Sequence, residues 1–340
     1  IKMAVQYWQE VGQPKKQKII ARWQSYHGNT MGALSAGGNK MRRAQFASLL
    51  IEMTHIDPVY EYRYRQDGET EEAFGLRMAN LLEAEIQRLG AENVAAFVAE
   101  PVVGATLGCV AAAKGYFKRI REICDKNNVL LILDEVMCGM GRTGSLFAYE
   151  QEGIAGDIVA IAKGLGAGYQ PIGATLAHGK IHEAIKAGSG FFQHGHTYLG
   201  HAIAAASSLK VQQIIQREKL LENVVKTGKF LQDNLQSALG NHEFIGQVRG
   251  RGMFIGVEIV KDRATKAAFD PSLKINAQVK ATALQNGLCV YGMPGTIDGK
   301  NGDHIMFATP FIINAAHVDE IVDKFTKSLD SVFASVAKAA

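Results

Sequence analysis

A lysine and an acidic pair stand at the ends of two apolar runs, where side chains of these types suit catalysis. Lys163 follows the apolar residues 158–162, and glycines loosen the chain after it. No acid close in the sequence is placed to pair with its amine, so the lysine is a candidate nucleophile. Asp134 and Glu135 follow a second apolar run, residues 129–133. The two positions together predict a cofactor held between an acid and a lysine.

The elements that position these residues alternate in type over the first two hundred residues. Short apolar runs predict buried strands, and the amphipathic segments between them predict helices. Fully apolar strands separated by helices indicate an α/β fold, a mostly parallel sheet sandwiched by helices. The predicted strands are residues 18–22, 94–99, 129–133, 158–162 and 173–177, and the predicted helices are residues 79–89 and 116–126.

Polar side chains gather where the predicted strands end. In parallel sheets the ligand lies beyond the carboxyl ends of the strands. Tyr26 and His27 follow the first strand, Glu100 follows the second, and Asp134 and Lys163 follow the next two. Position alone therefore selects these five residues as the candidate site.

The character of the chain changes after a long helical stretch, residues 200–239. We expect a large domain over residues 1–238 and a smaller α+β domain over residues 239–340. The Gly/Pro-rich stretch 292–303 reads as a loop able to reach the site. In the smaller domain the predicted strands are residues 253–260, 288–291 and 304–308, and the closing helix is residues 318–333.

Composition places the chain among ordinary globular proteins. It has 340 residues, 47% hydrophobic and 21% charged, with a formal net charge of +4. The basic residues are scattered without aromatic neighbours, so a nucleic-acid partner is not expected. The four cysteines form no C-x-x-C pair and the histidines show no metal-ligand spacing, which favours a reduced, intracellular and cytoplasmic setting. No apolar stretch approaches the ~20 residues of a membrane span, and no signal peptide is recognised.

Pyridoxal phosphate requires the side chains found at these strand ends. It needs a lysine for a Schiff base, a carboxylate on its pyridine nitrogen, a flat group on its ring and donors for its phosphate. Four segments, in the family's order, resemble the class III aminotransferases, the fold-type-I pyridoxal phosphate enzymes. They are residues 25–30 (SYHGNT), 131–144 (LILDEVMCGMGRTG), 157–174 (DIVAIAKGLGAGYQPIGA) and 195–201 (GHTYLGH).

This resemblance implies roles for the cofactor's ring end. Lys163 would form the Schiff base and later carry a proton between the substrate carbon and the cofactor. Asp134 would pair with the pyridine N–H. Tyr26 would stack on the ring, with Val136 packed on the opposite face. His27, from the same motif as Tyr26, would belong to the cofactor-binding residues.

The resemblance also implies roles further from the ring. Glu100 would hold the polar network beside the cofactor's hydroxyl. Thr197 would donate its hydroxyl to the phosphate of the neighbouring subunit, so that the protein would be a homodimer with shared sites. Structural alternatives exist for single residues, since Asp134 could cap a strand end and Thr197 could start a helix. The set in this order is poorly explained by such alternatives.

Two departures from the family pattern affect the expectations. The family's Gly-Ser pair, part of its phosphate cradle, stands just before the helix in which this chain begins at Ile1. We expect either a shortened chain or a truncated relative, and the second would bind the cofactor weakly.

No arginine follows Arg263, which disfavours a dicarboxylate bound by an arginine in the smaller domain. The glycines of Arg249-Gly250-Arg251-Gly252 predict a tight entry into the strand at Met253, and neither arginine is expected to be a substrate ligand.

The function that the resemblance implies is amino-group transfer. A donor amine or amino acid would pass its amino group to a keto acid through Lys163. One alternative is a racemase or aminomutase of the same fold, which would need no keto acid. The other is an inactive truncated relative that serves as an interaction module.

Overall fold

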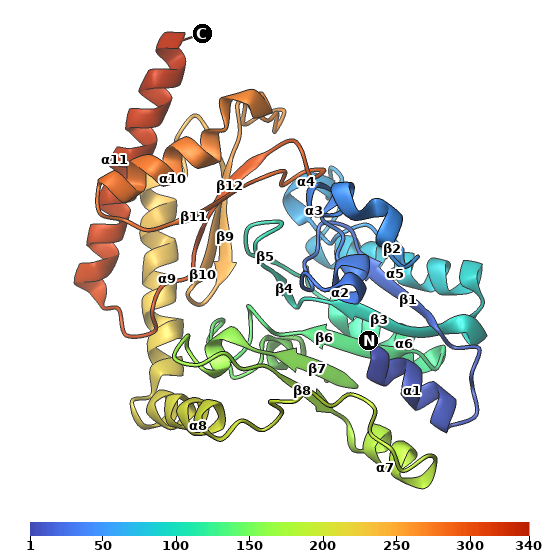
Figure 1. The fold of residues 1–340 in the computed structure, drawn as a ribbon. Coiled ribbons are helices and arrows are strands. Elements are labelled where there is room, and N and C mark those ends of the chain that lie inside the picture. The colour runs from blue at the N-terminus through green and yellow to red at the C-terminus, as the bar shows by residue number, and fades with distance from the viewer. Residues whose placement is uncertain (340) are drawn as a thin grey trace.

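The computed structural model describes the backbone of residues 1–339 and the side chains of residues 1–336. A six-stranded sheet in the order β2-β1-β3-β6-β7-β8 forms the centre of the larger unit (Figure 1). All neighbouring strands in it are parallel except the antiparallel pair β7 and β8, which confirms the predicted mostly parallel sheet. The strands are β1 Lys18–Arg22, β2 Thr54–Ile56, β3 Val94–Ala99, β6 Leu130–Asp134, β7 Ile158–Ile161 and β8 Ala174–Ala177.

Helices cover both faces of this sheet because its strands are apolar on both sides. In β6, Leu131 and Leu133 pack into the core under α5 and α6, whereas Leu130 and Ile132 pack into a separate core under α1 and α7. The alternation follows from the two-residue period of a strand. The four helices are α1 Lys2–Glu10, α5 Glu71–Leu89, α6 Tyr116–Lys126 and α7 Gly179–Ala187.

The predicted bounds of β3 and α6 are confirmed, but α5 begins earlier than the predicted residue 79. Its start is set by Thr70, whose hydroxyl oxygen accepts a hydrogen bond from the backbone N–H of Ala73 at 3.1 Å. Such a cap satisfies one of the free N–H groups in the first turn. The strand β2, between α3 and α4, was not predicted from the sequence.

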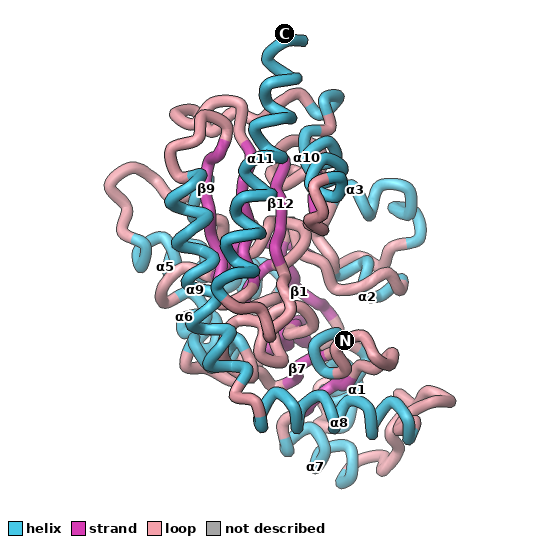
Figure 2. Tube along the Cα trace, turned by 90° about the vertical axis from the view of Figure 1, so that its left-hand side faces the viewer, coloured by secondary structure: helices cyan, strands magenta, loops and turns pink. Residues whose placement is uncertain are grey.

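The smaller unit is a four-stranded antiparallel sheet in the order β11-β12-β10-β9. Three helices pack against it, and Figure 2 shows α9 and α11 side by side in front of the strands. This arrangement confirms a smaller α+β unit after the large one. Its elements are α9 Leu220–Leu239, β9 Ile245–Arg251, β10 Phe254–Ile259, α10 Ile275–Gln285, β11 Tyr291–Pro294, β12 Asp303–Phe307 and α11 Ala315–Ala339.

The helical stretch predicted over residues 200–239 is two helices, α8 (Ala202–Arg217) and α9. Lys219 separates them with a left-handed φ of 50°. The side chains of Val224 and Leu231 on α9 lie in the core of the smaller unit. The boundary between residues 238 and 239 stays a prediction, and this packing favours placing it before α9.

The strand predicted at residues 288–291 is wrong in position, because β11 runs over Tyr291–Pro294. Pairing with β12 decides this register, Tyr291 opposite Met306 and Pro294 opposite Asp303. A proline is tolerated there because β11 is the edge strand. β9 was not predicted as a strand, and it contains Arg249.

Several short elements complete the fold. Among the described residues, no helix combines the length and the apolar character that crossing a membrane requires. The short elements are α2 Met31–Ala36, α3 Lys40–Arg43, α4 Glu61–Tyr64, β4 Val102–Val103, β5 Val110–Ala111 and the 3-10 helices η1 Ala44–Leu49, η2 Ala91–Asn93, η3 Ala148–Glu152, η4 Lys163–Leu165 and η5 Pro271–Leu273.

Candidate functional site

Strand register places three of the predicted residues at one edge of the large sheet. Ala99 pairs with Leu133, so Glu100 and Asp134 follow side by side. Asp134 pairs with Ala160 on β7, and Lys163 comes three residues beyond that partner. The sheet therefore gathers two acids and a lysine at its carboxyl edge, the position where such sheets bind ligands.

Asp134 is held through both carboxylate oxygens. Oδ2 lies 2.8 Å from Nδ1 of His27, and Oδ1 accepts the backbone N–H of Val136 at 3.0 Å. The side chains of Asp134 and His27 are 12% and 5% exposed. Three predicted residues from two segments thus meet in one contact network, and the direct pairing of His27 with Asp134 was not predicted.

Glu100 holds the neighbouring loop through its carboxylate. Its oxygens accept the backbone N–H groups of Tyr26 at 3.1 Å and Gly104 at 3.0 Å. Burial raises the pKa of the Glu100 carboxyl, the charge of Asp134 adds to this, and His27 and the two N–H groups oppose it. Glu100 therefore fixes the backbone of Tyr26, the residue predicted to stack on a cofactor ring.

Lys163 is exposed and stands in a strained backbone conformation. Its φ is 42°, in the left-handed region, and its carbonyl accepts hydrogen bonds from Gly166 and Ala167 at 3.2 and 2.8 Å. Such a conformation costs a non-glycine residue about 1–2 kcal/mol and recurs at functional sites. Within the part of the chain that the structure describes, no acid forms an ion pair with its amine.

Glu135 has a different role from its neighbour Asp134. It is fully buried, and its two oxygens accept the backbone N–H groups of Ala148 and Tyr149, each at 2.9 Å. Burial raises the pKa of this carboxyl to about 7. Glu135 therefore folds the loop after β6 back on itself and does not face the ligand side of Asp134.

Thr197 is not brought to the other predicted residues by this chain. It is exposed, and its neighbours Tyr198 and Leu199 are exposed by 79% and 69%. The segment is an open surface between α7 and α8. The predicted phosphate contact thus lacks a counterpart within one chain.

The loop predicted at residues 292–303 is shorter, residues 295–302 between β11 and β12, and it contacts the segment before Tyr26. Nε2 of Gln24 donates hydrogen bonds to the carbonyl oxygens of Gly295 at 2.6 Å and Thr296 at 3.1 Å. Gln24 stands two residues before Tyr26, so the smaller unit contacts the segment that carries the aromatic ring. Sequence reasoning missed Gln24, because a lone glutamine after a strand has no distinctive signal.

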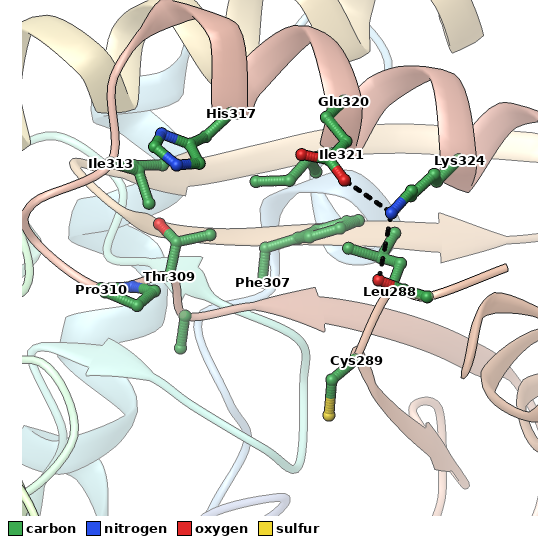
Figure 3. Close-up of a pocket in the computed structure, with 12 residues that line it drawn as sticks. Leu288, Cys289, Phe307, Thr309, Pro310, Ile313, His317, Glu320, Ile321 and Lys324 are labelled. Atoms are coloured by element: carbon green, nitrogen blue, oxygen red, sulfur yellow. Dashed lines mark hydrogen bonds and ion pairs between the residues drawn. The ribbon is translucent and has the colours of Figure 1, made fainter. Parts of the chain in front are cut away.

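A cavity of about 270 Å³ lies on the smaller unit and includes none of the predicted site residues. Figure 3 shows Leu288, Phe307 and Ile321 among the residues that line it and the amine of Lys324, which donates to Glu320 at 2.6 Å. This amine already has its partner, so the cavity offers no free charge. Within the described residues, no cluster of His, Cys, Asp and Glu is suited to a metal ion.

Comparison with known proteins identifies the family. Residues 1–329 match the class-III aminotransferase family. The chain is 45% identical to an uncharacterised aminotransferase of Schizosaccharomyces pombe, over 99% of this chain and 73% of that protein. It is 37% identical to the putrescine–pyruvate aminotransferase of Pseudomonas aeruginosa, over 99% and 71%. The crystal structure of an (S)-enantioselective omega-transaminase from Thermomicrobium roseum has a TM-score of 0.90 at 36% identity, covering 97% of this chain and 71% of that one.

Proposed function

Because this chain belongs to the class-III aminotransferase family, we propose that it transfers amino groups to keto acids with Lys163 as the reacting amine. The observation that carries the proposal is the gathering of Lys163, Asp134 and Glu100 at one sheet edge. Relatives are aminotransferases, so neither the racemase or aminomutase alternative nor the inactive interaction module is favoured.

The residues present fit the ring end of pyridoxal phosphate. Asp134 is buried and oriented by two contacts, and Nε2 of His27 is buried with no hydrogen-bond partner among the described residues, as expected beside a ligand. Tyr26 offers an aromatic face and Lys163 an amine without an ion pair. When bound, the cofactor supplies an aldehyde that captures amines and a ring that withdraws electrons.

Lys163 performs two tasks in this proposal. Its amine would hold the cofactor through the cofactor's aldehyde, and once a donor amine had freed it, Nζ would take the proton from the substrate carbon that bears nitrogen. The η4 turn holds Lys163 directly beyond β7, the strand that pairs with β6, so Lys163 and Asp134 follow the same edge of the sheet. The exposed position leaves the side chain room to move between the two tasks.

Asp134 stabilises positive charge at the ring nitrogen. A carboxylate whose geometry is preset needs no reorganisation when charge develops, which is a large source of catalytic rate. His27 holds one oxygen and the Val136 N–H holds the other. Val136 and Tyr26 are proposed to pack on opposite faces of the ring.

Thr197 is proposed to act across a homodimer. Large apolar side chains surround it on the surface of the single chain, which marks an interaction site. A second copy covering this surface would bring Thr197 to the phosphate in the partner's site. The exposed fractions are 63% for Phe191, 48% for Phe192, 79% for Tyr198, 69% for Leu199 and 63% for Ile203.

The proposed substrates follow the names of the relatives. One of them is a putrescine–pyruvate aminotransferase and another an omega-transaminase, so the donor proposed here is an amine distant from any carboxylate. The proposed acceptor is pyruvate or 2-oxoglutarate. The identity of the acceptor separates this function from an isomerase, which would turn over without one.

The experiment that tests the function is the Lys163→Ala variant with putrescine and pyruvate. We expect loss of turnover and of the visible absorbance of bound cofactor, with an unchanged circular dichroism spectrum. Lys186→Ala, an exposed lysine at the end of α7, is the matched control and should behave like the wild type. Substantial turnover in Lys163→Ala would contradict the assignment, and wild-type turnover without a keto acid would contradict transamination.

A further inference from the structure

Arg42 differs from the other arginines of the chain. Every other arginine donates at least one side-chain hydrogen bond to a described residue, and Arg42 donates none. Its neighbour Arg43 shows the common pattern, with Nη1 donating to the carbonyl oxygens of Leu34, Ser35 and Gly37. Arg42 also forms no ion pair with a described acid.

The guanidinium of Arg42 lies beside the proposed site. Its central carbon is 4.8 Å from the centroid of the Tyr26 ring. The backbone of Tyr26 is held by Glu100, and the backbone N–H of Arg42 donates to the buried Asn39 side chain at 3.0 Å. The backbone on both sides of this contact is thus held in place, while the positive charge of Arg42 has no acidic partner among the described residues.

The exposed nitrogens of Arg42 point to the kind of ligand. Nε is buried and has no hydrogen-bond partner within the part of the chain that the structure describes, whereas Nη1 and Nη2 are not buried. Two neighbouring donors match the two oxygens of a carboxylate. Lys40 and Arg43 on the same short helix add positive charge, so an anion is favoured here.

We propose that Arg42 binds the substrate carboxylate at the rim of the site beside Tyr26. This inference rests on the proposed transaminase function and names the group that recognises the keto acid. No arginine follows Arg263, so the smaller domain offers no alternative guanidinium beyond that point. The arginines near the site, Arg22 and Arg142, already donate to backbone carbonyl groups.

The test compares two acceptors that differ in the carboxylate. Pyruvate and propanal have the same number of carbons, and putrescine, which has no carboxylate, serves as the donor for both. In Arg42→Gln we expect the KM for pyruvate to rise about 10- to 100-fold, the value of a charge-assisted bidentate contact, with the KM for propanal unchanged. Arg42→Lys keeps the positive charge but loses the planar guanidinium that can donate two parallel hydrogen bonds. Its KM for pyruvate should therefore lie between those of the wild type and Arg42→Gln.

The control is Arg88→Gln, which removes the same kind of side chain at an exposed position in the last turn of α5. It should leave both KM values unchanged, and thermal unfolding of all variants checks that the fold is kept. An equal loss with both acceptors would overturn the inference. So would weaker binding of pyridoxal phosphate by Arg42→Gln in an absorbance titration, since that assigns Arg42 to the cofactor phosphate.

The two proposals fail in different ways. If the wild type transfers no amine from putrescine or any other donor to pyruvate, the transaminase function itself is wrong. If the wild type is active and Arg42→Gln has an unchanged KM for pyruvate, only the role of Arg42 is wrong. A rise in the KM of Arg42→Gln for pyruvate, without a rise for propanal, supports both the transaminase function and the role of Arg42.

Discussion

At the scale of single residues, the site depends on how its acids are held. Asp134 has a contact on each oxygen, and Glu100 uses both oxygens to hold backbone N–H groups. Glu135, next to Asp134 in the chain, accepts two backbone N–H groups of the loop after β6. Three carboxylates that look alike in the sequence therefore do three different tasks.

Asp134→Asn tests the electrostatic role. The amide has nearly the same shape but no charge, so it cannot stabilise a protonated ring nitrogen. We expect kcat to fall about 100- to 1000-fold, the typical effect of removing a preorganised electrostatic contact, while the chain stays folded. Steady-state kinetics with saturating cofactor measures this.

The matched control is Asp67→Asn, an aspartate on the exposed segment after α4. It should leave kcat unchanged. If Asp134→Asn kept more than about a tenth of the wild-type kcat, the charge at this position would not matter to the reaction.

At the scale of elements, the helix α9 and the turn between β9 and β10 approach each other closely. A methyl group on Gly228 of α9 would lie 2.4 Å from the backbone carbonyl of Gly252 in that turn. The contact requires a glycine on the helix, and it brings the helix to the sheet of the smaller unit. Helical periodicity indicates which face of α9 is buried but carries no information on this distance.

Gly228→Ala should separate α9 from this turn. Overpacking of this kind destabilises a fold by about 1–3 kcal/mol. Chemical denaturation of the variant and the wild type measures the difference in the free energy of unfolding. Gly179→Ala, at the start of α7 with nothing within 4 Å of the added methyl, is the control and should be neutral or stabilising. Equal effects of the two substitutions would contradict the close packing.

At the scale of the whole molecule, a buried network joins the two units. Arg249 of β9 donates to Glu258 of β10 and, at 2.5 and 2.8 Å, to the carbonyl oxygens of Leu107 and Gly108 in the large unit. The predicted tight entry into the strand near Met253 is confirmed, since Gly252, with a φ of 57°, turns the chain directly before β10, while Arg249 itself lies within β9. His304 of β12 lies against Gly108, where an added methyl would be 2.6 Å from its ring.

His304 should make this junction sensitive to acid. Burial, with the nearby charge of Arg249, lowers the pKa of His304 from 6.5 to about 3. Between these values the unfolded chain binds a proton that the folded chain does not, so stability is present above pH 6.5 and is lost as the pH falls toward 3. At pH 4 this costs roughly 3 kcal/mol relative to pH 7.

Urea unfolding at pH 7 and pH 4 measures this effect in the wild type and in His304→Gln. The glutamine keeps an acceptor for Thr296, whose hydroxyl lies 2.7 Å from Nδ1 of His304, and it does not titrate. The loss of stability between the two pH values should be smaller in the variant by roughly 3 kcal/mol. The same loss in both proteins would show that His304 is protonated in the fold.

Apolar strands followed by polar residues were sufficient to predict the large sheet and the polar residues at its carboxyl edge. β3 and α6 lie within the predicted bounds, and Glu100, Asp134 and Lys163 lie at the predicted edge because register follows from consecutive parallel strands. Edge and short strands such as β2, β9 and β11 were missed or displaced. Their residues lack a buried-strand pattern, and pairing with partners distant in the sequence decides them.

The sequence by itself determined the class of fold and the family, and it selects Lys163 as the proposed reacting amine, since these depend on local pattern and on motifs in a fixed order. Only the tertiary structure decided which side chains share partners. His27 meets Asp134 across 107 positions of the sequence, and Arg42 lies beside Tyr26 without an ion pair to any acid that the structure describes. Hydrogen bonds and ion pairs depend on distances of a few ångströms between segments far apart in the chain, and no periodicity in the sequence encodes such distances.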